Sequence, residues 1–275
     1  MKRAGIIGWP VSHSLSPLLH GFWLKQLGIA GEYVRLPAAP GNFAAVIAQA
    51  RKDGFAGVNV TVPHKEAAFA LAERKTPSAL QAGAANLLVF KDGIAADNTD
   101  TYGLVQSLKA VALGGKTAVL LGAGGAARGA VLALGQLGAA KIHILNRSAG
   151  KAQALASALQ SSVSAKLVPG ALQTWPQVAG EAALLLNSTS AGMKGNDPLA
   201  LDLSALPPNA VVCDIVYNPL QTQLLKDAAA RGHQTIDGLG MLMHQAVPSF
   251  EAFYGVRPEV TPQLRAVLEA ALNAA

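Results

Sequence analysis

Short apolar runs alternate with longer amphipathic segments along the first hundred residues of the chain. Short apolar runs indicate strands, and apolar positions at helical spacing indicate helices. The predicted strands lie at 4–8, 32–36, 57–61 and 86–90, with helices near 15–28, 41–52 and 64–73. This alternation predicts an α/β fold.

The same alternation restarts after Gly114 and Gly115. Strands are predicted at 117–121, 141–145, 183–187, 211–216 and 233–237, and helices beginning at 125, 149 and 221. A series of this kind is typical of a doubly wound, Rossmann-like nucleotide-binding domain. Two further helices are expected near 239–254 and 261–273, and periodicity alone assigns them to neither series.

The composition excludes several classes of protein. A chain of 275 residues can form one large domain or two modest ones, and 51% hydrophobic residues exclude intrinsic disorder. The single cysteine, Cys213, excludes an intrachain disulfide and favours a reducing, cytoplasmic compartment. The apolar run before Pro10 is short, and the one at 117–140 is interrupted by Arg128, so neither a secretory leader nor a membrane span is expected.

The charge balance favours a small ligand over a nucleic acid. Lys and Arg number 22 against 16 Asp and Glu, but the basic residues are scattered and aromatic residues make up only 5% of the chain. A modest positive field suits a small anionic ligand, although a solvated surface explains it equally well. The six histidines show no metal-site spacing, so no metal is expected.

The strongest local signal is a glycine-rich turn after the strand at 117–121. Gly122, Gly124 and Ala127 match the template G-x-G-x-x-G/A directly between a strand and a helix. Such a turn lets the backbone approach a dinucleotide pyrophosphate, whose charge rests on the helix N-terminus. Similar turns occur in folds that bind no dinucleotide, but the strand-to-helix context favours dinucleotide binding.

The end of the next strand indicates which dinucleotide is bound. NAD-binding domains carry an acidic residue there, whereas this chain has Asn146, Arg147 and Ser148. Arg147, with Lys151 one turn later, can form charge-assisted bonds to a 2'-phosphate that an acid would repel. The sequence therefore predicts NADP over NAD; the alternative is an exposed arginine without a ligand.

Three polar clusters precede this segment. Ser12 and Ser14 follow the first strand and could bind a carboxylate. The motif NVTVPHK at 59–65 places Lys65 at the opening of a helix, where a cation opposes the helix dipole. Asp100 ends the motif DNTD and leads into another helix. Taken singly, each cluster is also explained by helix capping or by solvent exposure.

Together, the motifs resemble the shikimate dehydrogenase family over essentially the whole chain. The resemblance rests on SHSLSP at 12, NVTVPHK at 59, GAAN at 83, DNTD at 97, GAGGAAR at 122, NRS at 146, NSTSAGM at 187, DIVYNPLQTQLL at 214 and DGLGMLMHQA at 237. It implies reversible, NADP-dependent oxidation of shikimate to 3-dehydroshikimate in aromatic amino-acid biosynthesis. It also implies a substrate domain of residues 1–101 and 237–275, a Rossmann-like domain of residues 102–236, and an active site in the cleft between them.

The resemblance also implies roles for individual residues. Lys65 and Asp100 would form the catalytic acid-base pair. The residues expected around the substrate are Ser12, Ser14, Thr61, Lys65, Asn86, Asp100, Tyr217 and Gln245. Those expected at the cofactor are Gly122, Ala123, Gly124, Gly125, Ala126, Asn146, Arg147, Ser148, Lys151, Ile215, Gly238 and Met241. The protein is expected to be a monomer or homodimer with a small-molecule substrate.

The sequence departs from the family pattern at Leu87, Ala96 and Thr101, which flank Asn86 and Asp100. A relative that oxidises quinate or an amino analogue therefore remains an alternative. A second rival, glutamyl-tRNA reductase, needs a cysteine nucleophile, whereas Cys213 falls in an apolar strand of the cofactor domain. A third is an NADP-binding module without turnover, against which the presence of both Lys65 and Asp100 argues.

Overall fold

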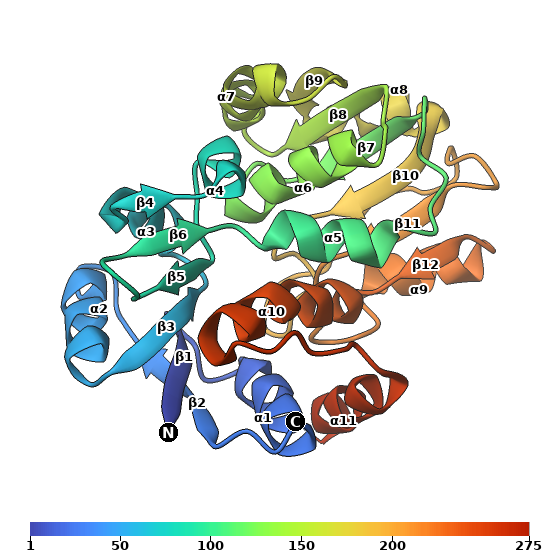
Figure 1. Cartoon of the computed structure of the whole chain (residues 1–275). Coiled ribbons are helices and arrows are strands. Elements are labelled where there is room, and N and C mark those ends of the chain that lie inside the picture. The colour runs from blue at the N-terminus through green and yellow to red at the C-terminus, as the bar shows by residue number, and fades with distance from the viewer. Residues whose placement is uncertain (275) are drawn as a thin grey trace. The chain divides into compact units, whose positions relative to one another are not determined.

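The computed structural model describes residues 1–274. The chain forms two compact units: Met1–Thr99 together with Gln245–Ala275, and Asp100–His244. The domains expected from the sequence comprise residues 1–101 with 237–275, and residues 102–236. That the first binds the substrate and the second the cofactor stays a prediction. Each unit is built around its own sheet (Figure 1).

The first unit contains a mixed six-stranded sheet in the order β2-β1-β3-β5-β6-β4. β1 is parallel to β2 and β3, β5 is antiparallel to β3 and β6, and β4 is parallel to β6. The strands are β1 (Lys2–Gly8), β2 (Gly31–Pro37), β3 (Phe55–Val60), β4 (Arg74–Lys75), β5 (Leu87–Val89) and β6 (Ala95–Asp97). The helices are α1 (Ser16–Gln26), α2 (Phe43–Lys52), α3 (Lys65–Leu71), α4 (Pro77–Ala82), the later part of α10 (Gly238–Tyr254) and α11 (Pro262–Asn273).

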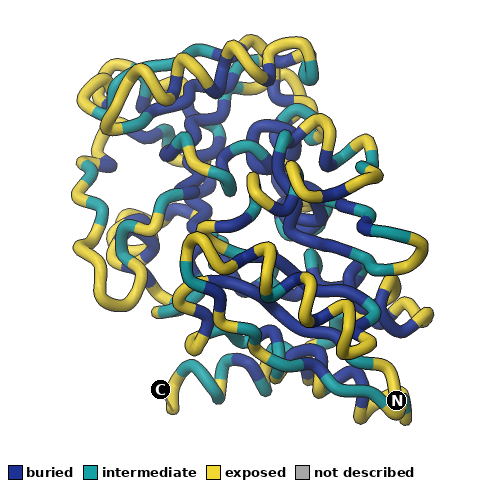
Figure 2. Tube along the Cα trace, turned by 90° about the vertical axis from the view of Figure 1, so that its left-hand side faces the viewer, coloured by how far each residue is buried: buried dark blue, intermediate teal, exposed yellow. Residues whose placement is uncertain are grey.

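Apolar spacing explains how these helices cover the sheet. α2 buries Phe43, Ile47 and Ala50, which are four and three residues apart and so share one helical face. Ile47 joins a core that includes Val58 and Leu88 from the sheet. Figure 2 shows helices alternating between buried and exposed positions, as helices with one face on a core do.

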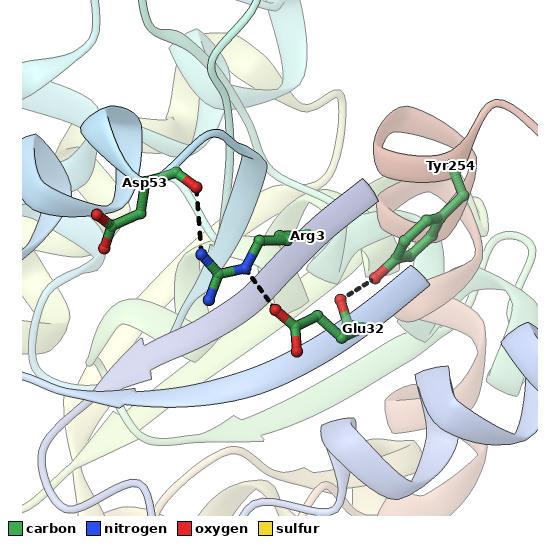
Figure 3. A network of polar contacts seen from close by, with 4 residues as sticks. All are labelled: Arg3, Glu32, Asp53 and Tyr254. Carbon is green, nitrogen blue, oxygen red and sulfur yellow. Dashed lines mark hydrogen bonds and ion pairs between the residues drawn. The ribbon is translucent and has the colours of Figure 1, made fainter. Parts of the chain in front are cut away.

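A polar network ties the edge of this sheet to the end of α10 (Figure 3). The Arg3 guanidinium forms an ion pair with Glu32, donates to the Asp53 carbonyl at 3.2 Å and lies 4.6 Å from the centre of the Phe55 ring. The Tyr254 hydroxyl donates to the Glu32 carbonyl at 2.8 Å. These bonds connect β1, β2, the turn after α2 and the last turn of α10.

The second unit contains a fully parallel sheet in the order β12-β11-β10-β7-β8-β9. The strands are β7 (Thr117–Leu121), β8 (Lys141–Asn146), β9 (Lys166–Ala171), β10 (Ala182–Asn187), β11 (Val211–Asp214) and β12 (Gln234–Ile236). The helices are α5 (Asp100–Leu108), α6 (Gly125–Gln136), α7 (Ala149–Leu159), α8 (Trp175–Val178), α9 (Gln223–Ala230) and the first turns of α10. Numbered within the unit, the strand order is 3-2-1-4-5-6, the doubly wound order of dinucleotide-binding domains.

Buried apolar clusters cover both faces of this parallel sheet. Leu120 and Ile144 belong to the cluster that contains α5, α6 and α7 residues, whereas Leu121 and Leu185 belong to the cluster with α8 and α9 residues. Strands covered on both faces read as continuous apolar runs, which is why TAVLL and ALLLN are recognisable as strands. The predicted two-domain α/β fold class is confirmed.

Three short or irregular strands, β4, β6 and β9, are absent from the sequence prediction. β9 contains Pro169 and Gly170, which usually argue against a strand. The structure places β9 at the sheet edge, where a proline costs no central hydrogen bond. β4 and β6 are two and three residues long, too short for any periodicity. Over residues 1–274, no helix is long and apolar enough to cross a membrane.

Candidate active site

The loops after β1 and β3 lie at the same edge of the first sheet. β1 and β3 are parallel, and the ladder continues with a bond from the Thr61 amide to the Ile7 carbonyl at 2.9 Å. Ser12 and Ser14 follow β1, and Thr61 follows β3. A Cβ at Gly8 would lie 2.4 Å from Thr61 Cγ2, so glycine is what allows this close approach. The structure therefore brings the predicted serines and Thr61 to one edge.

The serine loop has features suited to a carboxylate. Ser12 is exposed, and Ser14 Oγ accepts a hydrogen bond from the Ser16 amide at 3.2 Å. The Arg35 guanidinium donates to the Ser14 carbonyl at 2.7 Å. Hydroxyl donors beside a guanidinium form a favourable environment for an anion.

Lys65, Asn86 and Gln245 also belong to the first unit. The Lys65 carbonyl accepts from the Ala85 amide at 2.9 Å, so the start of α3 lies against the segment that carries Asn86. The Asn86 side chain is buried; its Oδ1 accepts from the Thr99 amide at 2.8 Å, and its Nδ2 donates to Gln245 Oε1 at 3.4 Å. Thr99, which the sequence analysis did not single out, therefore fixes the Asn86 amide.

Asp100 and Tyr217 are the two predicted substrate residues that belong to the second unit. Asp100 is the first residue of α5 and is 5% exposed. A Cβ at Gly129 of α6 would lie 3.2 Å from Asp100 Cβ, and the Thr101 hydroxyl donates to the Gly129 carbonyl at 3.4 Å. Tyr217 lies in the loop after β11 and is half-buried. The close contact with α6 holds the start of α5, and with it Asp100, against the helix that follows the glycine turn.

The glycine turn has the geometry that a pyrophosphate needs. Gly122 has a φ of 108°, and a Cβ there would lie 2.8 Å from Ser188 Oγ. Gly124 is the N-cap of α6, and a Cβ there would meet no atom within 4 Å. The first position therefore requires glycine for folding, whereas the second leaves space beside the N-terminus of a 12-residue helix. Ala123, Gly125 and Ala126 complete the turn, and these residues fit a dinucleotide.

The end of β8 lies beside this turn. β7 and β8 are parallel, with Leu121 opposite Leu145. Asn146 Nδ2 donates to the Ser148 carbonyl at 3.0 Å, and Ser148 is the N-cap of α7. Arg147 and Lys151 are both exposed. The structure thus brings the predicted 2'-phosphate residues to the same sheet edge as the glycine turn.

The residues predicted for the nicotinamide end meet at the start of α10. A Cβ at Gly238 would lie 2.1 Å from the Ile215 carbonyl oxygen, so only glycine permits this contact. Met241, one turn later, packs against the apolar core of the second unit. Gly238 and Ile215 are therefore direct neighbours.

A buried carboxylate supports the loop that carries Ile215 and Tyr217. Asp214 accepts from Asn187 Nδ2 at 3.0 Å, from the Val216 amide at 3.0 Å and from the Thr222 hydroxyl at 2.8 Å. Burial raises the pKa of the Asp214 carboxyl, and these three hydrogen bonds oppose that rise. This aspartate lies within the motif DIVYNPLQTQLL, and the sequence alone indicated no role for it.

One hollow lies outside the candidate site. An open hollow on the first unit is lined by Ala48, Arg51, Lys52, Phe55 and Phe90, none of which was predicted to bind a ligand. Within the described part of the chain, no group of three or more His, Cys, Asp or Glu residues is placed to hold a metal ion.

Two family models match parts of the chain. Residues 6–88 match the family model "Shikimate dehydrogenase substrate binding domain", and residues 104–194 match "Shikimate / quinate 5-dehydrogenase". The chain is 48% identical to the shikimate dehydrogenase (NADP(+)) of Mesorhizobium japonicum, over 98% of this chain and 97% of that protein. It is 51% identical to the protein of the same name from Methylobacterium radiotolerans, over 96% of this chain and 95% of that protein.

The chain belongs to the shikimate dehydrogenase family.

Solved structures agree with this family assignment. A shikimate 5-dehydrogenase from Thermus thermophilus in complex with NADP(H) and shikimate is 33% identical, with a TM-score of 0.86 over 100% of this chain and 99% of that one. A quinate dehydrogenase from Corynebacterium glutamicum in complex with NAD is 29% identical, with a TM-score of 0.89 over 98% of this chain and 99% of that one. The predicted family is confirmed, and the curated relatives carry the name of the predicted NADP-dependent oxidoreductase.

Proposed function

We propose that this protein interconverts shikimate and 3-dehydroshikimate with NADP as the hydride carrier. The observation that carries the proposal is 48–51% identity over nearly the whole chain to shikimate dehydrogenases (NADP(+)). The glycine turn with Arg147 at the neighbouring strand end supports NADP as the cofactor, since an arginine there can bond a 2'-phosphate.

The proposed reaction requires a group that moves a proton. When bound, the nicotinamide takes up or gives back a hydride at the ring carbon that bears the hydroxyl. The hydroxyl proton must leave as the hydride does, so a positioned base is needed in one direction and an acid in the other. Lys65 would hold this proton on Nζ, and the Asp100 carboxylate would orient the amine and accept a hydrogen bond from the adjacent hydroxyl.

The remaining predicted residues would hold the substrate in place. Ser12 and Ser14 would bind its carboxylate, with the positive Arg35 beside their loop. Thr61, Asn86, Gln245 and Tyr217 would surround the ring and its hydroxyls. Such positioning keeps the reacting carbon within reach of the hydride carrier and excludes water from the site.

A quinate-oxidising enzyme is the second candidate, because the family model covering residues 104–194 names both substrates. Leu87, Ala96 and Thr101, which depart from the family pattern, are 2%, 1% and 5% exposed. Their buried side chains support an effect on substrate choice only through the neighbouring Asn86 and Asp100. The relatives of 48–51% identity, which are named shikimate dehydrogenases, favour shikimate.

A panel of substrates and cofactors tests the proposal. The initial rate of NADPH or NADH formation is measured with shikimate or quinate and with NADP or NAD. The proposal expects the highest kcat/KM for shikimate with NADP. A higher kcat/KM for quinate would establish the second candidate, and no turnover with either substrate would contradict both.

Replacement of the lysine tests the mechanism. Lys65→Ala is expected to lower kcat by roughly 10² to 10⁴ while KM changes much less, the range for loss of a general acid-base group. Near wild-type turnover by folded Lys65→Ala protein would reject the role of this amine.

The cellular location and the oligomeric state of the enzyme are also part of the proposal. The single buried thiol of Cys213 is consistent with a cytoplasmic location. A monomer or a homodimer is expected, and sedimentation of the purified chain would distinguish them.

A further inference from the structure

A chain of buried hydrogen bonds lies behind Asn86 and Gln245 in the first unit. The Tyr33 hydroxyl donates to Asn59 Oδ1 at 2.7 Å. Asn59 Nδ2 donates to Ser249 Oγ at 2.7 Å and to the Asn86 carbonyl at 3.2 Å. The side-chain amide of Asn59 therefore contacts β2, the segment before β5, and α10 at once.

The side chains that form these bonds are removed from water. Asn59 and Tyr33 are 5% and 7% exposed, and Ser249 is fully buried. A buried amide is costly unless it is hydrogen-bonded, and an apolar side chain could fill the same space without that requirement. What the amide adds is directional contact, because each of its bonds specifies where a neighbouring backbone segment or side chain must lie.

Ser249 transmits this constraint to Gln245. The two residues are one turn apart in α10, and the Ser249 hydroxyl donates to the Gln245 carbonyl at 3.5 Å. A bond from Asn59 to Ser249 thus fixes the rotation and height of the turn that carries Gln245. The same Asn59 amide also donates to the Asn86 carbonyl. One buried side chain therefore positions both residues whose amides are proposed to bind the substrate.

We infer that Asn59 and Ser249 are positioning residues that set the distance between the Asn86 and Gln245 side chains for the substrate ring. The inference rests on the proposed function, because it takes Asn86 and Gln245 to bind the substrate. Asn86 Nδ2 donates to Gln245 Oε1 at 3.4 Å, so the two side chains contact each other directly. Neither Asn59 nor Ser249 is proposed to touch the substrate.

Two substitutions interrupt this series of buried hydrogen bonds at different places. Ser249→Ala removes the acceptor for Asn59 and the donor to the Gln245 carbonyl. Asn59→Asp keeps the shape and the bond from Tyr33, but it places a carboxylate oxygen against the Asn86 carbonyl. Each variant is expected to raise KM for shikimate about tenfold, the size of one misplaced hydrogen bond. KM for NADP is expected to stay within about twofold of wild type, because the residues proposed to bind the cofactor belong to the second unit.

Non-additive effects of the two substitutions on KM distinguish a positioning role from a general loss of stability. In the double variant Asn59→Asp/Ser249→Ala, the rise in KM for shikimate should be smaller than the product of the two single effects, since both act through one contact.

The control is Thr261→Ala, in the same unit. The Thr261 hydroxyl accepts from the Leu264 amide at 3.2 Å as the N-cap of α11, and its loss costs about 1 kcal/mol of stability. This variant should leave both KM values unchanged. KM for shikimate within about twofold of wild type in folded Ser249→Ala would overturn the inference, and Ser249→Ala alone decides if Asn59→Asp does not fold. A wild-type enzyme without shikimate turnover would instead contradict the proposed function.

Discussion

Acidification is expected to destabilise the first unit through a single buried histidine. His20 of α1 is 0% exposed, its ring stacks on that of Tyr33 with centroids 3.9 Å apart, and the rings of Trp23, Phe250 and Phe253 surround it. Within residues 1–274, neither ring nitrogen has a hydrogen-bond partner. Burial lowers the pKa of His20 to about 3, because nothing in this aromatic cluster compensates a charge.

The size and sign of the effect follow from this lowered pKa. In the unfolded chain the imidazole takes up a proton near its ordinary pKa of 6.5, whereas in the folded chain it does so only near 3. The unfolded state therefore binds more protons between these values, and stability is lost as pH falls through this window. At pH 5 the loss is about 2 kcal/mol relative to pH 8, at about 1.4 kcal/mol per pH unit below 6.5.

Urea unfolding at pH 8, 6 and 5 measures this loss. Both proteins compared carry Trp175→Phe, so that their tryptophan fluorescence comes from Trp9 and Trp23. Both tryptophans belong to the unit that contains His20. His20→Leu removes the titrating group at nearly the same volume. Other groups titrate in both proteins, so the difference between them isolates His20.

The variant is expected to lose about 2 kcal/mol less than the protein with His20 on going from pH 8 to pH 5. Equal losses in the two proteins would show that the folded state accommodates the imidazolium. The reasoning from burial to stability would then be refuted.

Three further predictions concern the second unit. Gly124→Ala, with open space around the new methyl group, should leave the melting temperature unchanged but raise KM for NADP about tenfold or more. Gly122→Ala should also lower the free energy of unfolding by roughly 1–3 kcal/mol, because the φ of Gly122 is 108°. Equal KM values for wild type and Gly124→Ala would contradict close approach of the pyrophosphate. Arg147→Ala should raise KM for NADP at least about tenfold without changing KM for NAD, and a parallel change with both cofactors would exclude a 2'-phosphate contact. Burial raises the pKa of the Cys213 thiol, so a thiol reagent should modify no cysteine in the folded protein and one after denaturation; rapid labelling of native protein would show that β11 opens.

The sequence predicted best those features that depend on local pattern. Parallel strands buried on both faces, such as β7 and β10, form unbroken apolar runs, and Gly122 and Gly124 occupy a turn whose geometry is local. The mixed sheet was harder, because β4 and β6 are too short to show a pattern and form by pairing with each other and with β5 rather than through their own residues. β9 was missed because its Pro169 is tolerated only where the sheet ends.

The supporting residues of the site depend on contacts between distant segments. Ser249 is an ordinary helix residue until the fold places it 2.7 Å from Asn59, which is 190 positions away. Asp214 falls inside the strand predicted at 211–216, whereas in the structure it ends β11 and is buried, with hydrogen bonds from Asn187 and Thr222. No periodicity records such pairs. Motifs therefore sufficed to propose the residues that bear the reactive groups, whereas the residues that support them could be found only in the structure.

The catalytic pair is tested most directly by a crystal structure of the protein with shikimate and NADP. The account predicts that Lys65 Nζ and an Asp100 carboxylate oxygen each lie about 3 Å from hydroxyls on the same side of the substrate ring, with the nicotinamide facing the carbon to be oxidised. A complex in which either side chain points away from the ring, or in which the ring lies far from the glycine turn at Gly122, would contradict it.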